Sequence, residues 1–350
     1  MLERLHIRNY RVFNDLEIDR LSRINLIAGK NNSGKTSLLE AIFLLSGAGN
    51  AQMAMNIMAF RGIDSVSGTS QTIRETFWKP IFSALDMDKT VEIRGHHESV
   101  GPLNLTVTLD TPRTTELPLK VPVGTNLAEL SSAPQLMFSF SSRLTGEIKG
   151  RMRTTGQAIQ LETPHAEVPF LSRFLSSRGG NLKEDAVLLG VLRRQKKGHL
   201  LLEALQSIEP RLQSIEDNSA SGEPLIWGDI GLSELVPLPV MGEGMTRIAR
   251  LVLAISATPN GVVLADEIEN GLHHSVLSKV WKVVDTAARQ FNTQIFATTH
   301  SFECVEAAQK ALGADGFLLH RLEANGTENR CVTYESEEID VALRHNLEIR

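Results

Sequence analysis

Eight consecutive residues near the amino terminus have the types and the spacing that bind the phosphates of a nucleotide. Residues 29–36 read Gly-Lys-Asn-Asn-Ser-Gly-Lys-Thr and satisfy every fixed position of the pattern G-x-x-x-x-G-K-[ST]. The glycines let successive main-chain N–H groups face the anion, and Lys35 is expected to reach the β- and γ-phosphates. The alternative is an ordinary turn rich in glycine and asparagine. We predict that ATP is bound by Gly29, Asn31, Asn32, Ser33, Gly34, Lys35, Thr36 and Ser37, with the Thr36 hydroxyl on Mg²⁺.

Two acids follow an unbroken apolar run further along the chain. Residues 261–265 predict a buried strand, and Asp266 and Glu267 come directly after it, which is the arrangement known as a Walker B sequence. An acid at the carboxyl end of a parallel strand points into the crevice where α/β sheets bind ligands. We therefore expect Asp266 to hold Mg²⁺ and Glu267 to activate the attacking water as a general base. A strand that ends in two surface acids is the alternative.

A histidine follows the next predicted strand. Residues 294–298 predict a second buried strand, and His300 comes just after it. Because the carboxyl ends of neighbouring parallel strands meet at one edge of a sheet, His300 is placed to contact the γ-phosphate beside Asp266 and Glu267. A structural or solvated histidine is the alternative interpretation. The predicted catalytic residues are Glu267, His300 and Lys35.

Hydrophobic periodicity predicts the elements that must position these residues. Residues 24–28 predict a strand and residues 37–45 an apolar helix, which is the order that the phosphate-binding pattern requires. From residue 242 onward, predicted helices and strands alternate, as expected of a parallel sheet. The nucleotide residues are therefore expected at one edge of an α/β sheet.

The long middle of the chain has a different pattern. Residues 51–60 have helical character, and residues 90–161 are mostly predicted strand. A helical insertion is expected over residues 182–215 with a break at Pro210, followed by a loop at residues 217–222. We therefore expect an insertion that contains both strands and helices.

Composition is typical of a globular protein. Of the 350 residues, 42% are hydrophobic and 22% are charged. No apolar run approaches the roughly 18 residues that span a bilayer, and the first residues lack the layout of a signal peptide. Cys304 and Cys331 are too few for a disulfide framework or a four-ligand zinc site. We expect a cytoplasmic protein with no membrane association.

The charge of the chain bears on nucleic-acid binding. A net charge of −5 gives no overall attraction for DNA, so contact with DNA requires a local basic patch. Residues 193–197 form one candidate patch. Lys149, Arg151 and Arg153, on a predicted strand, form the other. Solvated surface charge is the alternative for both.

Further motifs complete a resemblance to a known group of proteins. They are residues 7–13 (Ile-Arg-Asn-Tyr-Arg-Val-Phe), Gly-Glu-Gly-Met at 242–245, Asp-Glu-Ile-Glu-Asn-Gly-Leu-His at 266–273, and Thr-Thr-His-Ser at 298–301. Together with the phosphate-binding loop, they resemble the ABC-type ATPases of the SMC/Rad50/RecF and OLD-like group. The chain is similar to the compact AAA-family ATP-binding proteins of prokaryotic defence loci. The resemblance covers residues 1–320 and extends weakly into the tail.

The resemblance implies a fold. It is an α/β P-loop NTPase, an ABC-type head with a mixed β-sheet and a helical and β insertion. Residues 1–50 and 225–325 would form the ATPase core. Residues 51–224 would form a β-rich lobe with the helical insertion, and residues 326–350 a C-terminal tail that packs on the core.

The resemblance also implies how two chains cooperate. In this group two heads pair face to face, and each supplies a signature segment to the ATP of the other. Here Gly242, Glu243 and Gly244 would be that segment, and residues 270–273 would form a loop across the interface. Many relatives carry serine where this chain has Gly242, so only main-chain N–H groups could replace the serine hydroxyl. This difference puts the strength of ATP-driven dimerisation in question.

Two other elements of the group are less clear in this sequence. Arg11 resembles the arginine of the opening strands that approaches the bound nucleotide, with a surface arginine as the alternative. The glutamine loop typical of these ATPases is not identifiable.

The functional hypothesis is an ATPase whose ATP binding closes a homodimer or higher homo-oligomer. It would drive or sense a DNA- or effector-linked change in anti-phage defence or DNA repair, with ATP and Mg²⁺ as cofactors. A separate effector protein, a nuclease or a toxin, is the expected partner, with DNA as a further one. The alternatives are a nuclease-associated OLD-like ATPase subunit and a transporter-type ATPase. Only 50 residues follow His300, whereas a nuclease domain needs roughly 100. The long insertion disfavours a transporter ATPase, and its prolines disfavour a coiled coil.

Overall fold

One mixed sheet carries the nucleotide motifs. The computed structural model describes residues 1–63, 69–110, 134–155, 158–218, 224–314, 316–325, 328–345 and 347–349. The sheet has the strand order β16-β15-β3-β14-β13-β9. All neighbours are parallel except β15 and β16, which are antiparallel. Its strands are β3 (Ile24–Gly29), β9 (Ser172–Leu175), β13 (Val262–Ala265), β14 (Gln294–Thr298), β15 (Phe317–Asn325) and β16 (Glu328–Tyr334).

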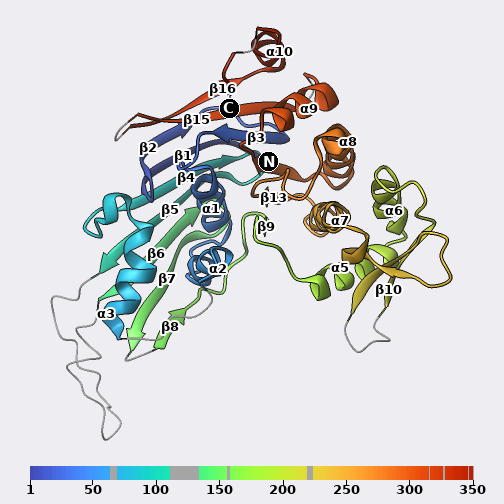
Figure 1. Cartoon of the computed structure of the whole chain (residues 1–350). Coiled ribbons are helices and arrows are strands. Elements are labelled where there is room, and N and C mark those ends of the chain that lie inside the picture. Colours follow the sequence, from blue (N-terminus) through green and yellow to red (C-terminus); the bar gives the residue numbers. More distant parts are fainter. Residues whose placement is uncertain are drawn as a thin grey trace, which may run out of the picture.

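A second sheet of seven antiparallel strands lies beside the first (Figure 1). Its order is β2-β1-β4-β5-β6-β7-β8. Alternate residues such as Leu103, Leu105 and Val107 are buried, as expected of a sheet with one covered face. Its strands are β1 (Leu2–Tyr10), β2 (Phe13–Ile18), β4 (Val91–His97), β5 (Gly101–Asp110), β6 (Gln135–Ser142), β7 (Gly146–Thr155) and β8 (Ala158–Glu162).

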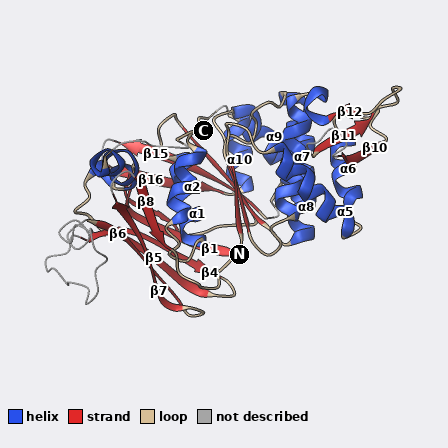
Figure 2. Cartoon of the chain, turned by 90° about the horizontal axis from the view of Figure 1, so that it is seen from below, coloured by secondary structure: helices blue, strands red, loops and turns tan. Residues whose placement is uncertain are grey.

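The helix α1 (Lys35–Ser46) lies between the two sheets and contacts strands of both (Figure 2). Every residue from position 37 to position 46 is buried, which explains why this helix is apolar on all sides. The helix α2 (Gln52–Phe60) packs against it. Because α1 is enclosed by both sheets, the loop in front of it has a rigid support.

Helices cover the other face of the six-stranded sheet. They are α7 (Glu243–Ser256), α8 (His274–Phe291) and α9 (Phe302–Leu312). Their apolar residues share a core with the inward residues of β3, β13 and β14. The helix α10 (Ser336–Arg344) contacts α9 and β15 near the end of the chain.

A smaller helical lobe projects from α7 (Figure 1). It contains α5 (Leu182–Arg194), α6 (Gly198–Gln206) and a three-stranded sheet of order β10-β11-β12. The strands of this sheet are β10 (Ser214–Asn218), β11 (Leu225–Asp229) and β12 (Val236–Pro237). Short elements complete the described chain: α3 (Ser70–Ile73), η1 (Arg74–Trp78), η2 (Lys79–Ile81), η3 (Ser83–Leu85) and η4 (Leu238–Met241).

The helical prediction for residues 182–215 is wrong over its last part. The helices end at Gln206, Pro210 lies in the following turn, and the chain then enters β10. Ser214 pairs with Asp229 of β11, so a long-range strand pairing overrides the local helical pattern. The predicted loop at 217–222 begins inside β10, and its residues 219–222 lie outside the described residues.

The sheets cross the domain limits expected from the sequence. β1 and β2, from residues 1–50, belong to the seven-stranded sheet of the insertion. β9, from residues 51–224, forms the edge of the nucleotide sheet, and β16, from residues 326–350, forms its other edge. Within the described residues, no helix is long and apolar enough to cross a membrane.

Candidate functional site

The phosphate-binding loop joins β3 to α1, and its two glycines occupy positions that a side chain would obstruct. Gly29 has a φ of 149° and Gly34 a φ of 100°. A Cβ atom on Gly29 would lie 2.6 Å from Ser33 Oγ, and one on Gly34 would lie 2.6 Å from the ring of Phe13. Among the described residues, Ser33 Oγ is buried without a hydrogen-bond partner, while Asn31 and Asn32 are exposed. A close-packed loop with an unsatisfied hydroxyl suits a phosphate group.

Lys35 lies across this loop. Its Nζ donates hydrogen bonds to the main-chain carbonyls of Gly29 at 2.7 Å and Lys30 at 3.0 Å. Burial lowers the pKa of Lys35, and the negative charges of Asp266 and Glu267 oppose that effect. Phosphate oxygens can replace the two carbonyls as acceptors of the hydrogen bonds from this ammonium group.

Thr36 and Asp266 meet although 230 positions separate them. Thr36 Oγ1 donates to Asp266 Oδ1 at 3.1 Å and to Oδ2 at 3.2 Å, and Thr298 Oγ1 donates to Oδ1 at 2.7 Å. Burial raises the pKa of Asp266, and the hydrogen bonds from Thr298 and Thr36 oppose the rise. A hydroxyl and a carboxylate that converge in this way are oxygen ligands of the kind that Mg²⁺ takes beside a phosphate. These residues therefore fit the predicted metal.

Glu267 is held by its main chain and its side chain. Its φ of 48° is unusual for a residue other than glycine, and its N–H donates to Thr298 Oγ1 at 2.8 Å. Its Oε2 accepts a hydrogen bond from Asn270 Nδ2 at 2.6 Å. Strained main-chain conformations of this kind persist where the surroundings fix them, often at functional sites. Thr298 thus orients both acids, a role that the sequence pattern did not reveal.

His300 lies at the carboxyl end of β14, and Glu269 fixes the turn that carries it. Glu269 Oε1 accepts hydrogen bonds from Thr299 Oγ1 at 2.7 Å and from the His300 N–H at 3.0 Å, and it lies 3.3 Å from His300 Nδ1. The other oxygen, Glu269 Oε2, is buried with no hydrogen-bond partner in the described part of the chain. The imidazole is 54% exposed, so an incoming ligand can reach it. Sequence reasoning gave Glu269 no role in this turn.

The signature segment and the loop at residues 270–273 lie against each other. Gly242 has a φ of 124° and precedes α7, and both Gly242 and Glu243 are exposed. A Cβ atom on Gly244 would lie 3.2 Å from the carbonyl oxygen of Gly271. The two segments expected at a dimer interface therefore share one surface of a single chain.

The structure overturns the surface alternative for Arg11, while its approach to a bound nucleotide stays a prediction. Its side chain is only 9% exposed and forms an ion pair with Glu40 of α1, with Nε 2.7 Å from Oε2. It also donates to the Tyr10 hydroxyl and to the Pro80 carbonyl. Arg61 binds the same Glu40 carboxylate, which is itself buried. Arg11 is therefore not a free surface arginine. Its contacts tie the β1–β2 turn to α1.

Arg247 of α7 binds three main-chain carbonyls in two separate segments. Its Nη2 donates to the carbonyls of Asp266 at 2.6 Å and Glu267 at 3.0 Å, and its Nη1 donates to the carbonyl of Ser176 at 3.1 Å. Burial lowers the pKa of Arg247, and the charge of Arg250 acts in the same direction. Residue 176 directly follows β9, which lies next to β13. This contact links the segment after β9 to the two acids, and no sequence motif predicted it.

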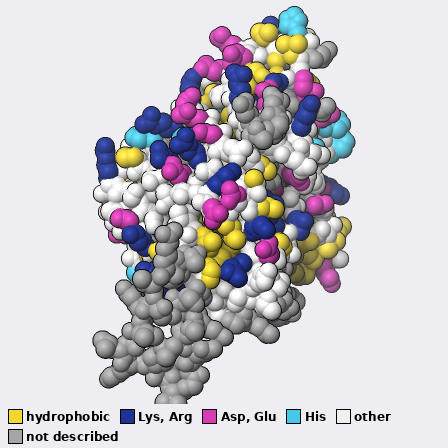
Figure 3. Space-filling model, turned by 90° about the vertical axis from the view of Figure 1, so that its left-hand side faces the viewer, with side chains coloured by type: hydrophobic (Ala, Val, Ile, Leu, Met, Phe, Trp, Pro, Cys, Tyr) yellow, Lys and Arg dark blue, Asp and Glu magenta, His cyan; other side chains and the backbone are white. Residues whose placement is uncertain are grey.

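Some of the charges in the two candidate basic patches are paired with carboxylates. Lys149 pairs with Glu147, Arg151 with Glu162, and Arg153 donates to Gln135. In the other patch, Arg193 pairs with Asp217. Basic and acidic side chains are likewise interspersed on the face in Figure 3. In the described ranges, no group of three or more His, Cys, Asp or Glu residues could hold a metal ion.

Two families match the sequence. Residues 1–90 match a family described as "AAA ATPase domain". Residues 164–306 match one described as "AAA domain, putative AbiEii toxin, Type IV TA system". The first match contains the phosphate-binding loop, and the second contains the strand with Asp266 and the turn with His300.

Curated relatives match over very different lengths. A protein of Helicobacter pylori named ATP/GTP phosphatase is 23% identical over 352 aligned positions, which cover 91% of this chain and 90% of that protein. The DNA replication and repair protein RecF of Thioalkalivibrio sulfidiphilus is 50% identical over 46 residues, which are 13% of each chain. The likeness to RecF is therefore local.

Solved structures share the fold. The SmcHead bound to the C-winged helix domain of ScpA has a TM-score of 0.51 with 10% identity, covering 98% of this chain and 99% of that one. An Smc head domain with an extended coiled coil, bound to the C-terminal domain of ScpA derived from Pyrococcus furiosus, has a TM-score of 0.50 with 11% identity. It covers 99% of each chain. The arrangement of the two sheets around α1 is thus that of an ABC-type head.

Proposed function

We propose that this chain, which belongs to the SMC/Rad50/RecF-like ABC-type ATPases and hydrolyses ATP, uses ATP binding to pair two heads and so to control an effector. The observation that carries the proposal is the convergence of Lys35, Thr36, Asp266 and Glu267 at one sheet edge. These residues supply the phosphate contacts, the metal ligands and the general base of a P-loop ATPase.

Each residue has a defined task in this mechanism. Lys35 neutralises the β- and γ-phosphates, and Thr36 and Asp266 hold Mg²⁺, which offsets negative charge on the phosphates when bound. Glu267 accepts a proton from the attacking water, and His300 contacts the γ-phosphate from the end of β14. Asn270 holds the Glu267 carboxylate in place.

Pairing of heads is supported by the surface that Gly242, Glu243 and Gly244 share with residues 270–273. A single head leaves one side of the γ-phosphate open, and a partner's main-chain N–H groups would complete its contacts. The assembly would serve anti-phage defence or DNA repair, through a nuclease or toxin partner and, in the second case, DNA. The family description that names a toxin–antitoxin system supports the first role.

Glu267→Gln tests the hydrolytic site. The variant should bind ATP while turnover falls by about 10² to 10⁴, because the base is lost but the phosphate and metal contacts remain. Steady-state turnover and retention of labelled ATP are measured together. Turnover at the wild-type rate would exclude Glu267 as the base.

Pairing is tested in the same Glu267→Gln background by light scattering with and without ATP. Gly244→Arg should suppress ATP-dependent assembly and leave ATP affinity unchanged. Because a side chain at position 244 also presses on Gly271 within the chain, Glu243→Arg serves as a second variant at an exposed position. Unchanged assembly in both variants would refute pairing through this surface.

A further inference from the structure

The edge strand β9 has one side that no strand covers. β9 is last in the order of the six-stranded sheet and pairs only with β13 among the described strands. The carbonyls of residues 171 and 175 accept hydrogen bonds from the β13 side. Because alternate residues of a strand direct their N–H and C=O groups to opposite sides, Phe174 directs both of its groups away from β13. An uncovered edge of this kind accepts a further strand.

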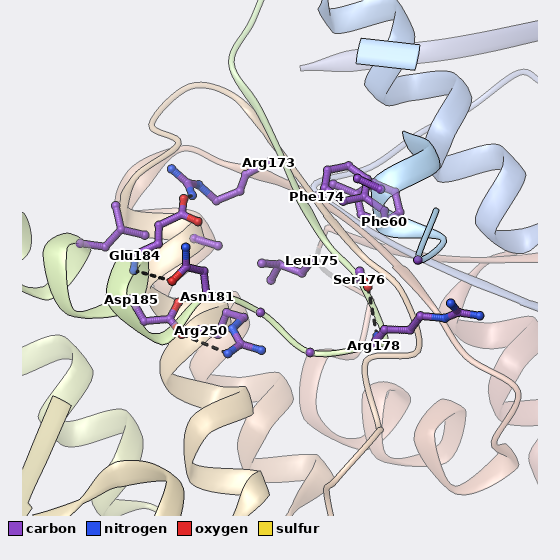
Figure 4. A pocket seen from close by; sticks show the side chains of 16 residues that line it. Phe60, Arg173, Phe174, Leu175, Ser176, Arg178, Asn181, Glu184, Asp185 and Arg250 are labelled. Carbon is purple, nitrogen blue, oxygen red and sulfur yellow. Dashed lines mark hydrogen bonds and ion pairs between the residues drawn. The ribbon is translucent and has the colours of Figure 1, made fainter. Parts of the chain in front are cut away.

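A cavity of about 830 Å³ lies along this edge (Figure 4). One wall is the end of α2, with Ala59 and Phe60, and Phe60 stacks on Phe174 with the ring centroids 4.7 Å apart. The opposite wall is formed by α5 and α7 and includes Leu188 and Ala254. Side chains of an added strand alternate between its two faces, so one set would face the wall of α2. The other set would face the wall of α5 and α7, which carries Glu184, Asp185 and Arg250 beside its apolar residues. The cavity therefore has the walls and the base that an extended peptide requires.

The charges around the cavity favour an acidic occupant. Arg173 pairs with Glu184, and Arg250 pairs with the buried Asp185. Arg178 is exposed, and its Nη1 donates only to the carbonyl of Arg61, at 2.5 Å, with no carboxylate partner among the described residues. One positive charge at the end of β9 thus remains without an opposite charge.

We propose that this slot, defined by β9, α2, α5 and α7, binds an extended acidic segment of a partner protein. The segment pairs with Phe174 as an additional strand and places a carboxylate on Arg178. This inference rests on the proposed function only in naming the effector as the source of the segment, since binding itself requires no ATP.

The slot is connected to the nucleotide site by main-chain contacts. The Ser176 carbonyl, at the end of β9, is bound by Arg247, which also binds the carbonyls of Asp266 and Glu267. A partner that pairs with β9 therefore lies one side chain away from the acids that handle ATP. This position suits an attached effector that must respond to the nucleotide state.

A random octapeptide library displayed on phage tests the slot without a known partner. The library is selected on the nucleotide-free wild-type protein and counter-selected on Ala59→Trp, in which an exposed residue of α2 fills the slot. Val187→Trp, an exposed change on α5 outside the cavity lining, is the matched control. Enriched peptides should alternate apolar residues and carry aspartate or glutamate at one end. Enrichment of peptides without acids, or of none, refutes the proposal.

The most enriched peptide is then synthesised and its affinity is measured by fluorescence anisotropy. Arg178→Glu should weaken binding by about tenfold or more, since it reverses the unpaired charge, and Arg344→Glu on α10 should not. A peptide with N-methylated main chain should fail to bind, because it cannot pair with β9. Equal affinity of the two charge variants, or undiminished binding of the methylated peptide, overturns the proposal.

Two further outcomes are distinct. If the wild-type protein enriches no peptide but self-associates and Ala59→Trp disperses it, the slot serves a second copy and the partner proposal is wrong. ATP turnover is measured on the same preparation. An active ATPase that binds no peptide refutes the slot alone, whereas an inactive protein that binds the acidic peptide refutes the proposed function alone.

Discussion

Two parts of the same sheet edge are built in different ways. At the ends of β3 and β13, the contacts are made by side chains: Lys35 binds carbonyls of the phosphate-binding loop, and Thr36 binds Asp266. At the end of β9, the contacts involve the main chain: Arg247 binds the Ser176 carbonyl, and no strand pairs with the N–H and C=O groups of Phe174 among the described residues. The first part is specified by residue type and the second by strand order.

This difference explains what each part can do. Side chains of fixed type provide charge, metal ligands and a base, which chemistry on a triphosphate requires. Main-chain groups on an edge strand provide pairing that tolerates many sequences. We therefore distinguish a proposed catalytic region at β3 and β13 from a proposed coupling region at β9.

The largest effect is expected from Lys35→Ala in the catalytic region. ATP affinity should fall by about 100-fold or more, because charge-assisted hydrogen bonds of about 1.5–3 kcal/mol each are lost. Lys30→Ala is the matched control, since Lys30 is exposed and only its carbonyl contacts Lys35. Equilibrium binding of a fluorescent ATP analogue gives the answer. Equal losses in both variants would mean that general charge, and not Lys35, holds the phosphates.

The sequence signals for the proposed catalytic region are local, and the roles of its residues stay predictions. A few consecutive residues suffice to recognise each signal: the strand before Gly29, the helix after Gly34 and the acids after residue 265. The family and the α/β head fold followed from these signals and are confirmed. The coupling region was missed because the position of β9 beside β13 depends on a pairing across 90 positions. Arg247 shows no pattern in sequence, since it binds carbonyls, which every residue has.

A second test concerns Glu269, which follows β13 and holds the turn after β14. Glu269→Ala should lower kcat by about tenfold to 30-fold, because the Thr299 hydroxyl and the His300 N–H lose their acceptor. Glu269→Gln should restore most of the rate, since it keeps one oxygen for these donors and replaces only the unpartnered Oε2. KM for ATP should stay unchanged in both. A change in KM together with a fall in melting temperature, and no recovery of kcat in Glu269→Gln, would indicate a purely structural role.

A third test breaks the link between the two regions. Arg247→Lys should lower turnover by about tenfold, because one ammonium group cannot span the carbonyls that follow β13 and β9 as a guanidinium does. Amide hydrogen exchange should rise at residues 176–181 and stay constant in α9. Lys279→Arg, on the surface of α8, is a control for the exchange of one basic residue by another. Unchanged exchange after β9 would show that this segment is held without Arg247.

The smallest effect concerns stability and distinguishes a functional acid from a structural one. Burial raises the pKa of Asp266 above its ordinary value of 3.8 in the folded chain. As pH rises above 3.8, the unfolded chain loses this proton first, so the folded chain binds more protons and the free energy of unfolding falls. Once the pH exceeds the raised pKa of Asp266 in the folded chain, this group lowers the free energy of unfolding no further. Asp266 therefore destabilises the nucleotide-free protein near neutral pH.

Asp266→Asn should thus raise the melting temperature of the nucleotide-free protein near neutral pH, and the difference should shrink as pH falls toward 3.8, where the wild-type carboxyl becomes protonated. With Mg²⁺ and ATP the order should reverse, because ligand stabilises only a chain that binds it. Thermal melting with and without MgATP, over a range of pH, measures both parts. A variant that melts below the wild type in the absence of nucleotide would show that the Asp266 carboxylate stabilises the fold through Thr36 and Thr298. Asp266 would then stabilise the sheet as well as take part in its chemistry, and only β9 would still distinguish the two regions.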